Sequence, residues 1–193
     1  MSKPRLIKAD FVRAAAKLDV PIATIQAVAE VEARGSGFLP DGQPKILFEA
    51  HVFHRLTGGI FTARHPNISA PRWDRKLYKG GPAEHDRLAE AVKLNRERAL
   101  ESASWGVFQI MGFNWKACGY DSLQEFINAM FQSESDHLDA FVGFIRTSKL
   151  DTQLRQQNWA GFARSYNGPR YKENQYDIKI KRAFEKHSRA SSP

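Results

Sequence analysis

The sequence predicts a mainly helical α+β domain with one small β-hairpin. The chain has 193 residues, a length that suits one domain with a sizeable core. Along most of it, apolar residues recur at three- and four-residue spacing, which is the period of a buried helix face. The pair Asp41-Gly42 lies between two short extended stretches and indicates a hairpin turn. We expect residues 1–187 to form one domain and residues 188–193 to be a disordered polar tail.

The first half of the chain is predicted to alternate short helices with glycine-rich breaks. Residues 5–19 have the pattern of an amphipathic helix, and a second helix follows Pro21, which lacks an N–H that a helix start does not need. Gly35 ends that helix, because glycine readily adopts the left-handed conformation of a C-terminal cap. Residues 50–56 are expected to form a short helix. Residues 60–82 form a long surface loop, a feature that in compact domains is more often functional than idle.

The second half is predicted to be almost entirely helical. The segment 101–112 is an apolar stretch bounded by glycines, which we interpret as a further helical turn. The segment 165–169 contains Asn-Gly-Pro and breaks the chain before the last helix. We expect helices over 82–99, 122–131, 133–147, 151–164 and 170–186.

Charge and composition restrict the classes of partner. Lys and Arg total 29 against 21 Asp and Glu, a net charge of +8, which favours a polyanion such as nucleic acid, an anionic membrane surface or an acidic cell wall. No run approaches the ~20 apolar residues of a membrane span, and the N-terminus has no apolar segment of a secretory signal. The single cysteine, Cys118, cannot form an internal disulfide, and no Cys/His cluster has metal-ligand spacing. We therefore predict no metal and no cofactor.

Glu32 is the strongest candidate for a catalytic residue. It follows Ile25 and Val28 on the apolar face of the second predicted helix, at its C-terminal end. Burial and the negative end of the helix dipole both disfavour the anion, so the pKa of such a carboxyl rises. A carboxyl that holds its proton near neutral pH is suited to general acid catalysis. On this segment alone, however, a glutamate that faces solvent beside Arg34 is the more common arrangement.

Three glycine-punctuated segments resemble, in order and spacing, the signature segments of the lysozyme-like superfamily. They are the helix-terminal Glu32-Ala33-Arg34-Gly35, the Gly-x-x-Gln-Ile turn at 106–110 and the Tyr166-Asn167 pair. More closely, the chain resembles the N-acetylmuramidase family found in phage endolysins, over about residues 8–185. The motifs that carry this closer resemblance are those at 46–58, 101–112 and 165–168. Ala33 departs from the serine that many lysozyme-like proteins have after the catalytic glutamate.

The resemblance implies a lysozyme-like fold and a specific reaction. The enzyme is expected to cleave the β-1,4 bond between N-acetylmuramic acid and N-acetylglucosamine in peptidoglycan, and so to lyse bacteria. Glu32 is then the general acid that protonates the leaving oxygen, and a second carboxylate positions or activates water. Glu101 is the favoured second carboxylate, although it could equally be a dipole-stabilised residue of a helix end. Glu49 is its rival, unless it forms a buried ion pair, and Asp41 on the hairpin turn is a third possibility.

The resemblance also implies residues that contact substrate. Gln109, Tyr166 and Asn167 are expected to bind substrate in the cleft with Glu49, because amides and hydroxyls suit N-acetyl groups and ring hydroxyls. For Asn167, a tight Asn-Gly turn is the alternative interpretation. Three aromatic residues are expected either to stack on sugar faces or to belong to the core: Trp73, Tyr78 and Trp105. We interpret His51, His54 and Cys118 as structural.

Other functions are compatible with parts of the sequence. The same fold and Glu32 would serve a lytic transglycosylase, which needs no second carboxylate. The charge alone would suit a basic helical nucleic-acid-binding domain, but the basic residues are spread along the chain rather than clustered on one helix. A catalytically inactive wall-binding module is a fourth possibility. We expect a monomer that binds peptidoglycan strands and anionic wall polymers, and neither nucleic acid nor the membrane interior. It would be made in the bacterial cytoplasm and reach the wall through lysis machinery or injection.

Overall fold

Helices dominate the structure, and the strands are short. The structure, a computed structural model, describes residues 3–33 and 35–190. The α-helices are α1 (Lys8–Leu18), α2 (Ile22–Glu32), α3 (Ala50–Leu56), α4 (Ala83–Leu94), α5 (Arg96–Glu101), α6 (Leu123–Gln132), α7 (Glu134–Thr147), α8 (Asp151–Arg155), α9 (Trp159–Asn167) and α10 (Tyr176–Ala190). The strands are β1 (Ile46–Phe48), β2 (Ala103–Trp105) and β3 (Ile110–Met111), and the 3-10 helices are η1 (Arg75–Leu77) and η2 (Gly112–Asn114). The predicted mainly helical α+β class is confirmed.

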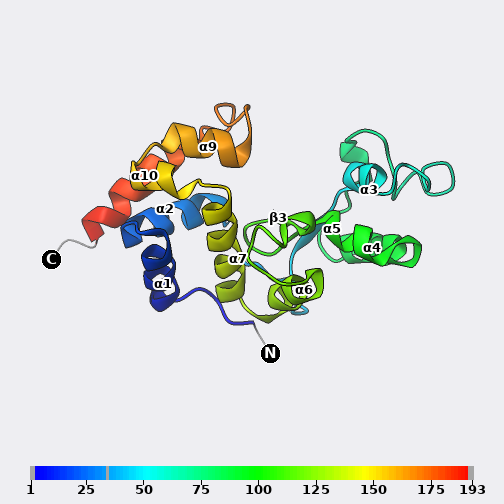
Figure 1. The fold of residues 1–193 in the computed structure, drawn as a ribbon, viewed down its shortest axis with the longest axis horizontal. Helices are drawn as coiled ribbons and strands as arrows, with labels where there is room; N and C mark the ends of the chain where they lie inside the picture. Colours follow the sequence, from blue (N-terminus) through cyan, green and yellow to red (C-terminus); the bar gives the residue numbers. More distant parts are fainter. Residues whose placement is uncertain (1–2, 34, 191–193) are drawn as a thin grey trace.

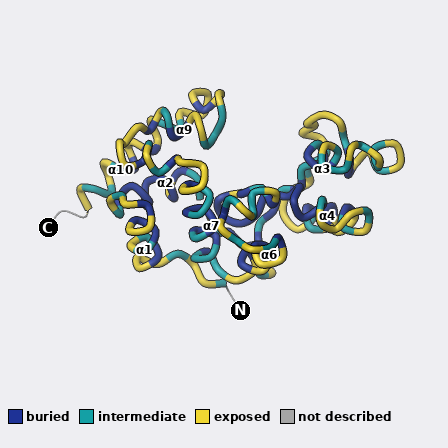
Figure 2. Tube along the Cα trace, viewed as in Figure 1, coloured by how far each residue is buried: buried dark blue, intermediate teal, exposed yellow. Residues whose placement is uncertain are grey.

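Helix α7 lies at the centre of the molecule, between two lobes (Figure 1). On one side lie α1, α2, α9 and α10, which we call the α2 lobe. On the other side lie α3, α4, α5 and the loop of residues 57–82, which we call the α3 lobe. In the α2 lobe, α2 packs extensively along α10 and also against α1, which contacts α7. In the α3 lobe, α4 packs against α5 and β1. Figure 2 shows buried residues along α2, α7 and the strands, and exposed residues on the outer turns of both lobes.

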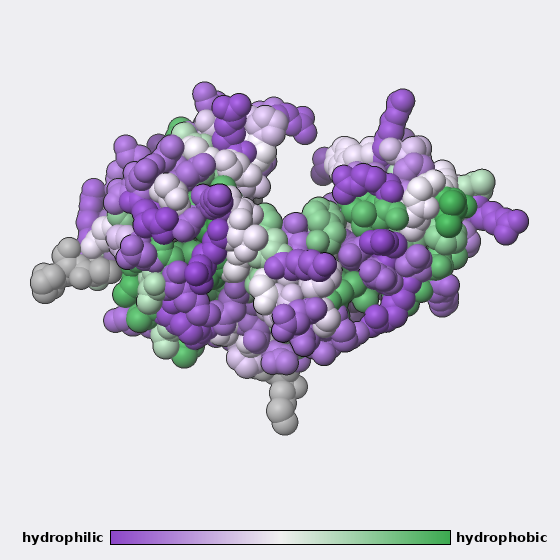
Figure 3. All heavy atoms as spheres, viewed as in Figure 1, coloured by the Kyte–Doolittle hydropathy of each residue, from purple (hydrophilic) through white to green (hydrophobic). Residues whose placement is uncertain are grey.

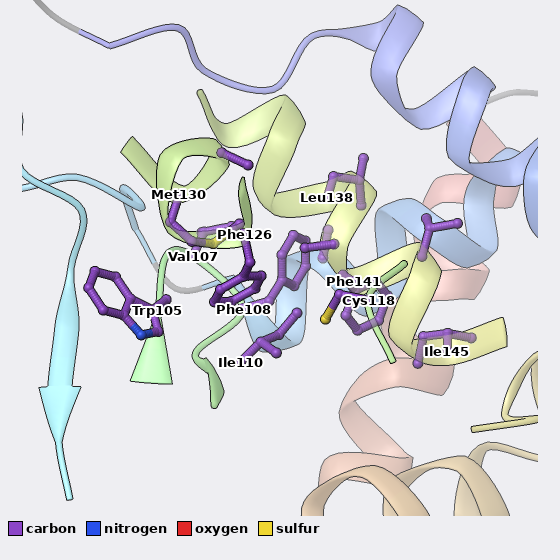
Figure 4. Close-up of a cluster of buried hydrophobic side chains, with 14 of the residues drawn as sticks. Trp105, Val107, Phe108, Ile110, Cys118, Phe126, Met130, Leu138, Phe141 and Ile145 are labelled. Carbon is purple, nitrogen blue, oxygen red and sulfur yellow. The ribbon is translucent and has the colours of Figure 1, made fainter. Parts of the chain in front are cut away.

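The hydrophobic core joins α7 to the sheet. Leu138, Phe141 and Ile145 recur at three- and four-residue spacing on α7 and are fully buried. Figure 4 shows them facing side chains from the β2–β3 segment and α6. Phe108 stacks on Phe141 with ring centroids 4.6 Å apart. This buried aromatic packing therefore holds the β2–β3 turn in a fixed position against α7.

The sheet differs from the predicted hairpin. Its order is β1-β2-β3, and both pairs are antiparallel, with Ile46 opposite Trp105 and Ser104 opposite Met111. The Asp41-Gly42 turn does exist, but its flanks meet only in the single bridge between Phe38 and Pro44. Strand β1 instead pairs with β2, more than fifty positions further along the chain. In this arrangement Ile46 and Phe48 are buried in the core, and Leu47 on the other face of β1 is half-buried.

The segment 101–112, predicted as a helical turn, is a strand–turn–strand. Its turn requires left-handed backbone at two residues, Gly106 at φ 71° and Gln109 at φ 50°. These conformations interrupt a helix but suit a tight connection. The apolar residues that indicated a helix face, such as Trp105 and Phe108, are buried because both faces of the segment contact core. Periodicity alone does not separate the two cases.

Two predicted helices are each split by an asparagine. The helix predicted over 82–99 breaks at Asn95, whose side chain accepts a hydrogen bond from the backbone N–H of Arg98 and so caps α5. The helix predicted over 151–164 breaks likewise, because Asn158 caps α9. Asparagine competes for backbone hydrogen bonds at such positions.

The C-terminal helix is shifted relative to its prediction. It was expected over 170–186, and α10 covers Tyr176–Ala190. Residues 188–190 are thus helical rather than part of the expected tail, because α10 continues its packing on α2. Residues 191–193 lie outside the described part of the chain. None of the described helices is long and apolar enough to cross a membrane.

Candidate active site

A cleft of about 450 Å³ opens between the two lobes. Figure 3 shows the surface hollowed between the lobe that carries α9 and the lobe that carries α3. Its walls come from the end of α2, from β1, from the β2–β3 turn and from the start of α10. The described lining residues are Val31, Glu32, Ser36, Leu39, Lys45, Ile46, Leu47, Gly80, Gly81, Gly106, Val107, Gln109 and Tyr176. Segments from both halves of the sequence therefore meet at one groove.

Glu32 is the one carboxylate among the described residues that line the cleft. It is the last residue of α2, one turn beyond Val28 and two beyond Ile25, which are both buried in the core on the same helix face. Glu32 itself is half-buried. The side-chain amide of Asn167 donates a hydrogen bond to its Oε1 atom, with a distance of 2.9 Å. The predicted placement of Glu32 at the end of a buried helix face is what the structure shows.

Tyr166 and Asn167 form the last turn of α9 beside Glu32. The Tyr166 ring stacks on Phe162 with centroids 5.6 Å apart, and its hydroxyl donates to the carbonyl oxygen of Phe108 at 3.3 Å. Burial raises the pKa of Tyr166, and the charge of Glu32 raises it further. The phenol is therefore neutral across the physiological range. Tyr166 links α9 to the β2–β3 turn, and it is not among the described residues that line the cleft.

Gln109 lines the cleft at the β2–β3 turn. Its side-chain Oε1 accepts a hydrogen bond from Ser104 Oγ at 2.8 Å, and its Nε2 donates to the Gly106 carbonyl at 2.9 Å. Its backbone is left-handed, with φ 50°, which is uncommon for a residue other than glycine. Such conformations concentrate at functional sites. Gln109 therefore holds the turn in shape and also presents an exposed surface to the cleft.

The structure places Glu101 in an ion pair rather than in the cleft. It ends α5, and Arg98 Nη1 lies 2.6 Å from its Oε2 atom. The side chain is buried, and it is not among the described residues that line the groove. The Glu101 carboxylate raises the pKa of Arg98, so the guanidinium of the pair stays charged. Helical i,i+3 spacing alone accounts for this pair.

Glu49 directly follows β1 and is not among the described residues that line the cleft. Side chains two apart on a strand share one face, so Glu49 extends the face on which Leu47 lines the groove. The Tyr78 hydroxyl donates a short hydrogen bond to Glu49, and His51 Nδ1 lies 3.3 Å from the same carboxylate oxygen. Burial raises the pKa of Tyr78, and the Glu49 carboxylate adds to this shift. A buried ion pair of Glu49 with Arg55 or Arg34 was the alternative interpretation of the sequence; no such pair with Arg55 occurs among the described contacts, and Arg34 lies outside the described residues.

The remaining candidates have structural environments. Asp41 is exposed, and its side chain accepts from the backbone N–H of Gln43 at 2.9 Å, which is an Asx turn. His54 Nδ1 lies 2.7 Å from Thr62 Oγ1. Trp105 is buried in the core. The Cys118 thiol is buried, which raises its pKa to about 12. Among the described residues, no three His, Cys, Asp or Glu side chains form a group that could hold a metal ion.

The sequence prediction missed Glu84, the most highly connected carboxylate near the cleft. Glu84 is fully buried in the first turn of α4 and accepts backbone hydrogen bonds from Phe48, Lys79 and Gly80. Arg87 Nη1 lies 2.8 Å from its Oε2 atom. Burial would raise the pKa of Glu84, but the backbone donors and Arg87 together lower it. A glutamate in the first helical turn after Gly-Gly-Pro is the available signal, because such residues reach back to free backbone N–H groups.

Comparisons with known proteins bear on the whole chain. The model of one family, described as Muramidase, N-acetylmuramidase, matches residues 21–188. The chain belongs to the N-acetylmuramidase family. It is also similar to a solved structure, the crystal structure of Burkholderia AP3 phage endolysin, with 46% sequence identity and a TM-score of 0.92. That match covers 97% of this chain and 72% of the endolysin chain. No curated protein matches the sequence.

Family membership confirms several predictions. The family inferred from the three motifs is the one found, and the lysozyme-like fold class agrees with the endolysin structure. The protein is an enzyme, a glycoside hydrolase of the lysozyme type that degrades peptidoglycan and so acts on the cell wall. The cleft is the place where such a substrate has access to a carboxyl group.

Proposed function

We propose that this muramidase cleaves the β-1,4 bond between N-acetylmuramic acid and N-acetylglucosamine, with Glu32 as general acid. The observation that carries the proposal is the position of Glu32, the one carboxylate among the described residues that line the cleft. Glycoside hydrolysis requires a proton donor at the bond that breaks. No other described side chain in the groove is a carboxyl acid.

Asn167 gives Glu32 a defined orientation. Its amide donates to Oε1 of the carboxyl group at 2.9 Å, so the proton for transfer belongs on Oε2. Transfer of that proton to the glycosidic oxygen breaks the bond to the anomeric carbon and leaves an oxocarbenium-like centre. A water molecule then attacks that carbon and loses its proton to a base. Gln109 and Asn167 are the polar groups that we assign to contacts with the N-acetyl groups and hydroxyls of the sugar.

Among the other carboxylates, the geometry favours Glu49 for activation of the water. Glu49 continues the cleft-facing side of β1 and is held by the Tyr78 hydroxyl. We assign Glu101 to the stability of α5, because it pairs with Arg98 inside the fold. Asp41 is occupied by its own turn. If Glu49 activates a water on the face of the sugar opposite Glu32, the anomeric configuration is inverted, whereas a covalent bond between Glu49 and the sugar would lead to retention.

The setting we propose is that of a phage endolysin that reaches the wall through lysis machinery. The structural similarity to an endolysin supports it. The net charge of +8 supports an attraction to anionic wall polymers, since a cationic protein accumulates at a polyanionic surface. We further propose that residues 1–187 act as one catalytic domain and that the enzyme is a monomer.

Digestion of purified peptidoglycan tests the assignment. We expect Glu32→Gln to lower the rate of digestion about 10²- to 10⁴-fold, because the amide cannot donate the proton. Glu49→Gln should lower it less, and Glu101→Gln should lower the melting temperature more than the rate. Mass spectrometry should find reducing ends; 1,6-anhydro ends would show a lytic transglycosylase instead. Full activity in Glu32→Gln, with an unchanged circular dichroism spectrum, would refute the proposal.

A further inference from the structure

We propose that Trp73 forms an outer subsite that binds a sugar ring of the glycan strand beyond the end of the cleft. The inference rests on the proposed function, because it takes a β-1,4-linked amino-sugar chain as the ligand. Trp73 is 60% exposed, although it is the largest apolar side chain type in the protein. Exposure of a single apolar side chain is common and does not by itself mark a site, so the inference depends on how the Trp73 ring is held and on what lies beside it.

The segment that carries Trp73 is held in place. Its ring lies 6.0 Å from the Tyr78 ring, centroid to centroid, at an interplanar angle of 44°. Asp74 accepts a hydrogen bond from the backbone N–H of Lys76 at 2.9 Å and so caps η1. Tyr78 is anchored by its hydrogen bond to Glu49 and by Arg87, whose guanidinium lies 5.8 Å from the ring centroid. A fixed aromatic surface binds with a lower entropic cost than a mobile one.

The same contacts connect Trp73 to the cleft. Leu47 lines the groove, Glu49 continues the same strand face, and the Tyr78 hydroxyl binds Glu49. A second connection runs along the backbone, because Gly80 and Gly81, two and three residues after Tyr78, also line the groove. Figure 1 shows the loop with η1 above α3, on the side of that lobe that faces α9 across the opening. Trp73 is therefore linked to the groove through the side chains of Tyr78 and Glu49, and it lies outside the groove lining itself.

The chemistry of this surface fits a wall polysaccharide. The ring carbons of a pyranose present C–H groups on one face, and the flat face of an indole is suited to pack against them. Exposed Arg72 and Arg75 flank Trp73, and residues 60–82 carry five Lys or Arg against one Asp. Peptidoglycan supplies both features, because its sugars carry peptide stems with carboxylates. A ring on Trp73 would be several sugars from the bond at Glu32, so the subsite would favour long chains over short ones.

Binding measurements in the Glu32→Gln background test the subsite without turnover. The probes are alternating N-acetylglucosamine–N-acetylmuramic acid oligosaccharides without stem peptides, a tetrasaccharide and an octasaccharide, measured by calorimetry. We expect Trp73→Ala to weaken octasaccharide binding about tenfold, the loss of one ring contact, and to leave tetrasaccharide binding unchanged. Trp73→Phe should retain most of the affinity. The matched control is Ile60→Ala, since Ile60 is 75% exposed on the same loop and is not aromatic.

Three outcomes would overturn the inference. They are equal octasaccharide affinity in Trp73→Ala and its parent, an equal loss for both oligosaccharides, and no binding of either oligosaccharide by the parent. In the active enzyme, Trp73→Ala should raise KM for intact peptidoglycan about tenfold with little change in kcat, and a fall in kcat alone would contradict the subsite. The result separates from the proposed function. An inactive Glu32→Gln with unaltered binding by Trp73→Ala refutes only the subsite, whereas an active Glu32→Gln refutes only the acid.

Discussion

Asn167 fixes the direction of one carboxyl group through one hydrogen bond. Its amide reaches Glu32 from the last turn of α9, more than a hundred positions away in sequence. The sequence motif indicated that the two residues belong to one site, but it did not indicate that Asn167 contacts Glu32 directly. This contact depends on how α9 is placed by its own aromatic packing, which includes the stack of Phe162 on Tyr166.

Removal of this donor should reduce catalysis more than stability. We expect Asn167→Ala to lower the rate of peptidoglycan digestion about 10- to 100-fold, because a hydrogen bond to a charged or proton-donating group is lost at the reacting atom. The melting temperature should stay within a few degrees of the parent. The control is Asn174→Ala, at an exposed residue of the neighbouring segment. Digestion at the parent rate by Asn167→Ala would show that Glu32 needs no orienting amide.

Glu84 is a second single residue with a large expected effect, because it supports a wall of the cleft. Its carboxylate holds the backbone of Lys79 and Gly80 against β1, and Gly80 lines the groove. We expect Glu84→Gln to lower the free energy of unfolding by about 3 kcal/mol, because it leaves Arg87 buried without its partner. Urea denaturation measures the loss. Glu97→Gln, at an exposed glutamate of α5, is the control and should have no measurable effect.

The pH dependence of this loss has a definite sign. The pKa of Glu84 is lower in the folded protein than its ordinary value, so its stabilisation is present above the ordinary value and is lost as pH falls through the folded value. The parent should therefore lose stability in acid more steeply than Glu84→Gln. Parallel curves of unfolding free energy against pH for the two proteins would show that folding does not change the pKa of Glu84.

At the scale of elements, apolar spacing predicted the helices well and the strands poorly. Helices such as α1, α2 and α7 appear where the period of apolar residues placed them. The residues 103–111 did not follow that rule, because they are buried on both faces and their turn depends on left-handed Gly106 and Gln109. No local pattern states that β1 will pair with a strand so far along the chain. That pairing is decided by packing of the whole core.

The break between α4 and α5 is a prediction at this scale. Asn95 Oδ1 accepts the backbone N–H of Arg98 at 3.0 Å and starts α5, the helix that leads into β2. We expect Asn95→Ala to lower the free energy of unfolding by about 1 kcal/mol, the usual cost of a lost cap. Asn95→Ser keeps a capping oxygen and should restore most of it, as measured by urea denaturation. Equal stability of Asn95→Ala and the parent would show that the cap is dispensable.

The molecule as a whole is cationic, whereas the groups that we assign to sugar contacts, Gln109 and Asn167, are uncharged amides. With a net charge of +8, we expect adsorption to intact peptidoglycan sacculi to weaken steeply between 50 and 300 mM salt (about 14 to 6 Å in Debye length). Cleavage of a soluble N-acetylglucosamine–N-acetylmuramic acid oligosaccharide without stem peptides, which carries few charges, should change much less over the same range. Pelleting assays and product analysis measure the two effects. Salt-independent adsorption would show that contacts in the groove, not charge, retain the enzyme on the wall.

At this scale the sequence was a good guide to function and a weaker guide to the site. The motifs around Glu32, Gln109 and Asn167 named residues that the fold brings together. They favoured Glu101 over Glu49 as the second carboxylate, because only the tertiary structure reveals that Glu101 pairs with Arg98 and that Glu49 continues a strand face. Glu84 was missed because its importance comes from backbone groups, which carry no residue identity.

The packing of α2 along α10 has a consequence for synthesis of the enzyme. Glu32 is translated well before α10, the helix that packs along its own helix, and before Tyr176, the residue of α10 that lines the groove. A nascent chain that already contains Glu32, the three strands and α7 still lacks the wall of the groove that Tyr176 provides. Assembly of the complete groove therefore waits until α10 has been translated, and a nascent chain that ends before α10 lacks both Tyr176 and the helix that packs on α2.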